Sequence, residues 1–269
     1  MNIISKILQT ISILSIPLSA SCVEEYKPIL ISSADAEAVG RKIWRNECGG
    51  TITGLTSWNQ GEDFPSLGIC HFIWYFKGQV SPFCEIFPDV LAFLVVRGVV
   101  LPDWLAKDRA CPWSSRDEFM QQLNSPQMVE LRELLQNTIC LQAEFMALRL
   151  QKSLPVMVSK FPQAKRQQMI KSFNLLMLQP QGLYAILDYL NFKGEGLLPT
   201  EAYQGEGWGL IQVLETMKES QGDESILNAF VEAANDVLER RVANSPIERN
   251  EKRWLKGWQN RTATYLRAE

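Results

Sequence analysis

The sequence of 269 residues contains a single histidine, His71, and none of its six cysteines belongs to a Cys-x-x-Cys pair. Zinc sites usually take their Cys and His ligands at characteristic spacings, and one histidine without a Cys-x-x-Cys pair does not match those spacings. The sequence therefore predicts no metal site, and we also expect no cofactor.

An excess of positive charge is also lacking, because 27 Lys and Arg stand against 30 Asp and Glu and leave a net charge of −3. This balance gives no reason to expect a nucleic-acid partner. Residues 239–269 differ, with eight basic against four acidic side chains and a net charge of +4. We interpret this basic end as a solvated helix face or as a surface that meets anionic glycan or peptide.

No integral membrane span is expected, and the apolar segment Ile7–Leu18 is too short and too interrupted to cross a bilayer comfortably. Lys6 precedes it, and Pro17 and the small residues 19–21 follow, which is typical of a secretory signal peptide. We predict a signal peptide over residues 1–21 and export to the periplasm or the medium. The alternative is an amphipathic helix.

Cys22 directly follows the predicted cleavage point and is a candidate lipid anchor, although Ser19 stands where lipoprotein signals usually have Leu. An exported chain could also form disulfides, for example between Cys84 and Cys111. The alternative is that several cysteines are buried as small apolar residues.

The apolar periodicity predicts a mainly α-helical (α+β) protein. Ser32 or Ser33 can cap a helix over residues 34–46, which ends before Gly49 and Gly50. Residues 51–76 look irregular or strand-like and predict a small β-hairpin insert. No repeat, low-complexity stretch or flexible linker is visible, so residues 22–269 are predicted to form one domain. Further helices are predicted over residues 88–100, 117–123, 127–153, 163–178, 182–192, 208–219, 224–242 and 246–268.

The segment from Ile43 to Phe72 carries most of the chemistry. Glu47 ends an apolar helical stripe and is followed by a glycine-rich turn. A carboxylate at the end of a helix can be partly buried at the edge of a cleft, where its pKa rises and it can act as a general acid. Glu47 is therefore the predicted catalytic residue.

This segment resembles the lysozyme-like superfamily, and the phage-type lysozymes in particular. In that family a helix ends at a catalytic Glu, and a short hairpin leads to a Thr/Ser-Ile/Leu-Gly-x-Gly-His run. Here Glu47 ends the helix and residues 66–71 read Ser-Leu-Gly-Ile-Cys-His. The resemblance implies a lysozyme-like helical domain that cleaves β-1,4 links in the glycan strands of peptidoglycan. It also implies a structural role for His71.

A second run, residues 209–213, is similar to the Gly-Leu-Met-Gln-Ile run that lines the cleft of lytic transglycosylases. Arg240, Arg241 and Trp254 resemble the ending of phage-type enzymes. The candidate substrate-binding residues are Trp58, Asn59, Ser66, Trp208 and Gln212.

The chain departs from the family at two positions. Family members often have an Asp nine residues after the Glu, where this chain has Thr56, and Cys70 replaces a family Gly. Asn59 is nearby but cannot act as a carboxylate base. Goose-type lysozymes and lytic transglycosylases are understood to need only one essential Glu. The candidate second acids are Glu62, Asp63 and Glu206.

Two other classes of function remain open. Cys48 and His71 could form a Cys–His cell-wall amidase, although no third group to orient the His is evident. The missing second carboxylate and Cys70 are also compatible with a non-catalytic lysozyme-like module that binds peptidoglycan or a protein.

Overall fold

The computed structural model describes residues 25–81, 83–218 and 223–267. The predicted signal peptide and Cys22 lie outside these residues. The protein is mainly helical with a small antiparallel sheet, which confirms the predicted fold class at this level. Within the described part of the chain, no helix is both long and apolar enough to cross a bilayer, as predicted.

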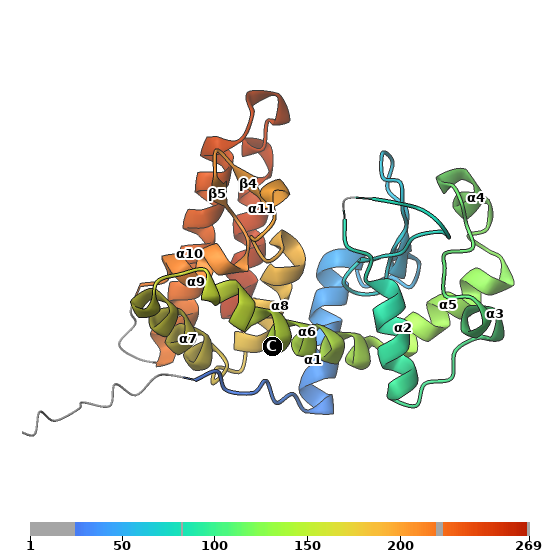
Figure 1. Cartoon of the computed structure of the whole chain (residues 1–269), viewed down its shortest axis with the longest axis horizontal. Coiled ribbons are helices and arrows are strands. Elements are labelled where there is room, and N and C mark those ends of the chain that lie inside the picture. Colours follow the sequence, from blue (N-terminus) through green and yellow to red (C-terminus); the bar gives the residue numbers. More distant parts are fainter. Residues whose placement is uncertain (1–24, 82, 219–222, 268–269) are drawn as a thin grey trace, which may run out of the picture.

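The described chain forms two lobes joined by one long helix, α6 (Ile139–Ser159) (Figure 1). The first lobe holds the three-stranded sheet, and the second is built from the helices that follow α6. Helix α1 (Ser33–Cys48) packs along α6. Gly40 allows this close approach, because a Cβ there would lie 2.7 Å from the Ile139 side chain and 2.9 Å from its carbonyl oxygen.

Local signals explain both ends of α1. The Ser32 side chain caps its start by accepting a hydrogen bond from the Asp35 amide. The helix ends because Gly49 adopts a left-handed conformation, with φ at 62°, and donates its amide to the Trp44 carbonyl. The predicted helix is confirmed, and Glu47 lies in its last turn.

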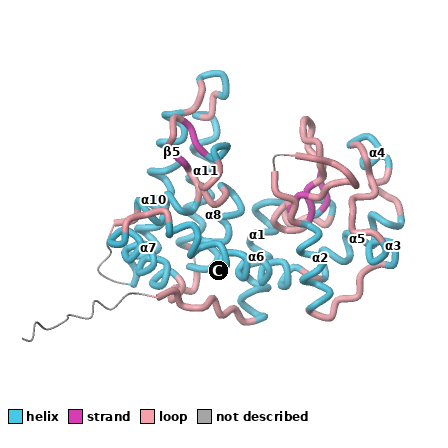
Figure 2. The backbone as a smooth tube through the Cα atoms, viewed as in Figure 1, coloured by secondary structure: helices cyan, strands magenta, loops and turns pink. Residues whose placement is uncertain are grey.

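The sheet consists of three two-residue strands in the order β1-β2-β3, all antiparallel. Figure 2 shows them within the first lobe. The buried Gln142 side chain ties the turn after β2 to α6, because its oxygen accepts from the Ile69 amide at 3.0 Å. The strands are β1 (Thr56–Ser57), β2 (Ser66–Leu67) and β3 (Phe72–Ile73).

The predicted helix over residues 127–153 is wrong in its bounds, because the chain breaks at Thr138, whose φ of −118° and ψ of 19° are not helical. The Thr138 hydroxyl donates to the Leu134 carbonyl at 2.7 Å, which stabilises the break. The helices of the first lobe after the sheet are α2 (Phe87–Val96), α3 (Asp103–Lys107), α4 (Arg116–Gln121) and α5 (Pro126–Asn137).

The second lobe contains helices near most predicted positions, but the predicted helix over residues 246–268 is interrupted. Asn250 has a left-handed φ of 46° and separates a short 3-10 turn from the last helix. A small hairpin of β4 (Ala202–Tyr203) and β5 (Glu206–Gly207) was not predicted. The helices are α7 (Gln163–Leu176), α8 (Gly182–Lys193), α9 (Leu210–Thr216), α10 (Asp223–Asn244) and α11 (Lys252–Thr262). The 3-10 turns are η1 (Thr53–Leu55), η2 (Pro199–Glu201), η3 (Ile247–Arg249) and η4 (Ala263–Leu266).

Candidate functional site

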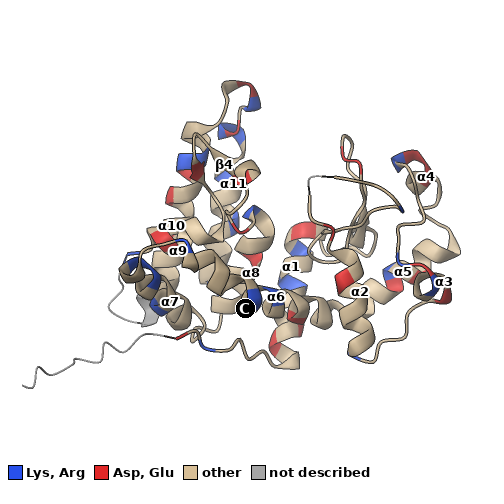
Figure 3. Ribbon diagram, in the orientation of Figure 1, with Lys and Arg blue, Asp and Glu red and all other residues tan. Residues whose placement is uncertain are grey.

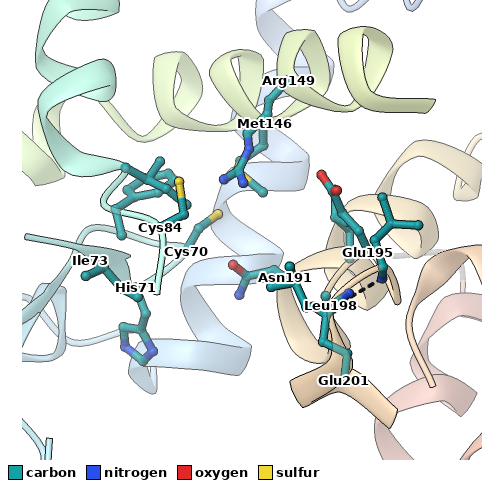
Figure 4. A pocket seen from close by; sticks show the side chains of 15 residues that line it. Cys70, His71, Ile73, Cys84, Met146, Arg149, Asn191, Glu195, Leu198 and Glu201 are labelled. Carbon is teal, nitrogen blue, oxygen red and sulfur yellow. Dashed lines mark hydrogen bonds between the residues drawn. The ribbon is translucent and has the colours of Figure 1, made fainter. Parts of the chain in front are cut away.

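A cavity of about 390 Å³ lies between the two lobes. Its walls come from four parts of the fold, as Figure 4 shows: the turn around His71, the segment of Cys84 and Ile86 before α2, α6, and the end of α8 with the following loop. The polar side chains that line it include His71, Arg149, Asn191 and Glu195. Volumes of this size are typical of sites for small ligands or ligand segments.

Glu47 lies beside this cavity through its contact with His71. One Glu47 carboxylate oxygen is 3.7 Å from the His71 Nδ1 atom, and the other forms an ion pair with Arg261. The Glu47 side chain is 15% exposed. The structure therefore places Glu47 in a partly buried position, as expected, but held by an arginine from near the end of the chain.

Arg261 is shared between Glu47 and a second carboxylate, Asp188, on α8. It donates from Nε and from a terminal nitrogen to the two Asp188 oxygens, each at 2.8 Å. Asp188 is fully buried and also accepts from the Tyr265 hydroxyl at 2.7 Å and the Asn46 amide at 3.0 Å. Four hydrogen bonds from three residues therefore satisfy the two Asp188 oxygens.

The same network keeps the arginine charged. Burial opposes the Arg261 charge, but the hydrogen bonds and charge of Asp188, together with the Glu47 charge, outweigh burial and raise the Arg261 pKa above its usual range. One guanidinium thus serves two carboxylates. Asp188 accepts two of its hydrogen bonds and Glu47 accepts one.

Cys48 and His71 are close enough to interact, with 3.8 Å between the sulfur and the His71 Nε2 atom. The structure also supplies the third group that sequence reasoning did not find, because Glu47 lies against the other ring nitrogen. Burial, and to a smaller extent the Glu47 charge, raises the pKa of the Cys48 thiol to about 12. The thiol is 3.6 Å from the Gly68 carbonyl and donates to it. A thiol with such a pKa is a poor nucleophile.

The turn containing Cys70 does not need glycine at that position. Gly68 and His71 adopt the left-handed conformations, with φ at 72° and 50°, whereas Cys70 is not among the residues with positive φ. A side chain at position 70 is therefore tolerated, and its sulfur lies buried at the cavity wall. Within the described chain all five cysteines are free thiols, so the bridge between Cys84 and Cys111 is not present.

The candidates in the loop between β1 and β2 lie together but do not contact Glu47. Trp58 is 5% exposed, packs edge-on against Phe119 and donates its ring nitrogen to the Glu62 carbonyl. Asn59 is exposed and donates to the Glu62 carboxylate at 3.1 Å. Asp63 is also exposed. Trp58 therefore offers no free ring face for a sugar.

The candidates from the second lobe have separate surroundings. Glu206 is exposed, lies 3.8 Å from Arg240 and lines a different hollow. Trp208 is 5% exposed and covered by Tyr203 and the Arg241 guanidinium. Gln212 accepts from the Gly209 amide and donates to the Gly196 carbonyl, so it braces the backbone. In the first lobe, Ser66 is buried in the middle strand β2.

The basic end of the chain is more than a solvated face. Arg241 pairs with the buried Glu251 at 2.7 Å, and Arg261 belongs to the Glu47 network. Acidic and basic residues both occur on α10 (Figure 3), whereas the charged residues of α11 are all basic. The interpretation as one solvated helix face is therefore wrong for these two arginines.

Sequence reasoning missed Asp188, Arg149 and Glu195, and counted Arg261 only as part of the basic end. A signal for Asp188 existed, because it is the one acid within the otherwise apolar and aromatic run of residues 183–190. An acid in a buried helix requires a partner. No local signal distinguishes Arg149 from other helix arginines.

The chain matches no protein-family model, no curated protein and no solved structure.

Proposed function

We propose that the protein cleaves β-1,4 glycosidic bonds in peptidoglycan, with Glu47 as the general acid. The observation that carries this proposal is the partly buried Glu47 carboxylate at the end of α1, next to the His71 side of the interlobe cavity. A helix with Glu47 in its last turn and the small sheet that follows it support the resemblance to the lysozyme-like superfamily.

The sharing of Arg261 is compatible with an acid role for Glu47. Arg261 gives two of its hydrogen bonds to Asp188 and one to Glu47, so it is not dedicated to Glu47. In this proposal Glu47 acts as the general acid. Donation of its proton to the leaving oxygen breaks the bond at the anomeric carbon.

The positive charge that develops on the sugar needs a second partner. Among the described residues that contact the Glu47 side chain, none is a carboxylate. We therefore assign this step to water or to the N-acetyl or hydroxyl group of the substrate, as in enzymes with a single essential Glu. Glu62, Asp63 and Glu206 have no part in it.

The test is release of soluble fragments from purified cell walls by the wild type and by Glu47→Gln, which keeps the shape and removes the acid. We expect the variant to lose roughly 100-fold or more in rate, as for removal of a general acid. Asp63→Asn, at an exposed acid of the loop between β1 and β2, is the matched control and should retain activity. Equal wall clearing by Glu47→Gln would overturn the assignment.

A second candidate is a non-catalytic module that binds peptidoglycan. The ion pair between Glu47 and Arg261 favours it, because an engaged carboxylate is also what a purely structural residue would show. Wild-type protein that sediments with purified walls but releases no fragments would support the module. The third candidate, a thiol amidase, is disfavoured by the raised pKa of Cys48.

A further inference from the structure

Two oppositely charged side chains line the interlobe cavity without pairing. Arg149 projects from α6 and Glu195 from the loop after α8, and Figure 4 shows both extending into the space between the lobes. Within the described part of the chain, neither side chain forms a hydrogen bond or an ion pair. Both are half-buried.

Another arginine beside α6, Arg97, which directly follows α2, behaves differently. Arg97 pairs with Glu144 of α6, about one turn and a half before Arg149 on the same helix. An arginine near α6 therefore finds a carboxylate where one is in reach. Arg149 and Glu195 line one cavity but remain apart, which leaves room for a ligand that carries both complementary charges.

The backbone fixes the position of Glu195. Its carbonyl accepts from the Ile211 amide at 3.2 Å, and the flanking glycines, Gly194 and Gly196, have φ values of 81° and 82°. Gln212 donates to the Gly196 carbonyl at 3.1 Å. Arg149 in turn stands on the long central helix. Backbone hydrogen bonds therefore hold both segments from which the two charged side chains project into the cavity.

We propose that the interlobe cavity binds an amino-acid group carrying both a free carboxylate and a free ammonium. Arg149 binds the carboxylate and Glu195 the ammonium, and Asn191, which also lines the cavity, offers a further hydrogen-bonding group. The apolar wall, which includes Met146 and Leu198, covers the aliphatic part of the ligand.

The inference rests on the proposed function, because that function identifies peptidoglycan as the source of the ligand. In a peptidoglycan substrate the group is the free end of a diamino acid in the peptide stem, so the cavity would select glycan strands that still carry stems. A free amino acid has the same chemistry, and the experiment separates the two sources.

Binding is measured by titration calorimetry in a Glu47→Gln background, so that no ligand is cleaved. The probes are a disaccharide with a stem ending in a diamino acid, the same disaccharide without peptide, and the free diamino acid. We expect the stem-bearing fragment to bind at least tenfold more tightly than the peptide-free one. Arg149→Gln and Glu195→Gln should each weaken that binding about tenfold, since each removes one charged hydrogen-bonding partner.

The matched control is Lys152→Gln, an exposed cation one turn further along α6 that lines a neighbouring hollow instead. It should leave binding unchanged. Acetylating the stem amine should weaken binding to the protein with Glu195 intact and have no further effect on Glu195→Gln. Thermal unfolding of every variant checks that the fold is retained.

Equal binding of the acetylated and free stems, or unchanged binding by both charge variants, would overturn the site. Binding of the free diamino acid as tight as that of the stem fragment, lost in both variants, would support the site but assign it to a free amino acid. The wall-cleavage assay with Glu47→Gln tests the proposed enzyme activity separately from this binding site. Normal cleavage with no stem preference would overturn this site alone.

Discussion

The Glu47 carboxylate and the Arg261 guanidinium form an ion pair although they lie 214 positions apart in the sequence. The contact joins α1, which packs on the central helix, to α11 at the end of the second lobe. Arg261 also holds the fully buried Asp188 of α8. One residue thus connects the predicted acid to the core of the second lobe.

Replacing Arg261 should lower the free energy of unfolding, because Arg261 pairs with the buried Asp188 as well as with Glu47. Arg261→Gln removes both hydrogen bonds to Asp188 and leaves a buried carboxylate unbalanced, which typically costs about 3–5 kcal/mol. Denaturant unfolding measures the loss. Arg267→Gln, an exposed arginine six residues later, is the control and should change stability by less than about 0.5 kcal/mol. An Arg261→Gln protein as stable as the wild type would show that Asp188 does not depend on this arginine.

Cys48→Ala should retain wall-degrading activity, because the thiol is buried and protonated and donates to the Gly68 carbonyl. We expect a stability loss of about 1–2 kcal/mol from the lost packing of the sulfur. Fragment release from walls, with and without iodoacetamide, is the measurement. Loss of activity in Cys48→Ala while Glu47→Gln stays active would instead identify the thiol enzyme.

Lys193 should make stability depend on pH. Burial, followed by the Arg241 charge, lowers the Lys193 pKa to about 6, whereas the Glu251 and Glu47 charges and the faces of Trp258 and Phe192 favour the ammonium. Between about pH 6 and the ordinary lysine pKa, the unfolded chain binds more protons at this site than the folded one. Its contribution to stability therefore rises as the pH rises through this window.

The variant Lys193→Met removes the amine and keeps most of the apolar stem. It should be more stable than the wild type by roughly 1–3 kcal/mol at pH 7, with a smaller advantage at pH 9. Guanidinium unfolding at pH 6, 7.5 and 9 gives the comparison, and the exposed Lys252→Met serves as control. A difference that does not vary with pH would mean that Lys193 stays charged in the folded protein.

Gly68→Ala should disrupt the turn after β2. Gly68 has a φ of 72°, and a Cβ there would lie 2.3 Å from the Gln142 side-chain oxygen that accepts from the Ile69 amide. Strain and a broken buried hydrogen bond together should cost roughly 2–4 kcal/mol. Gly78→Ala separates the two effects, because φ is 82° there but no atom lies within 4 Å of the added Cβ. Equal losses in the two variants would show that the contact with Gln142 is unimportant.

Much of the helical architecture could be predicted from local patterns, and the errors are informative. The helix over residues 34–46 was predicted because its cap, its apolar stripe and its glycine stop all lie within a few residues of one another. The break at Thr138 was missed, since the apolar period continues across it and the break is stabilised by a contact with the helix it ends. The hairpin from Ala202 to Gly207 was missed because two-residue strands have no period to detect.

The sequence by itself determined that Glu47 ends a helix beside a left-handed glycine, because capping and helix stops depend on interactions within one or two turns. Only the tertiary structure decided that this carboxylate meets Arg261 and shares it with Asp188, and that Arg149 and Glu195 line one cavity unpaired. Such pairs form between helices far apart in the chain. Their formation depends on how apolar faces pack, and no charge pattern along the sequence records that packing.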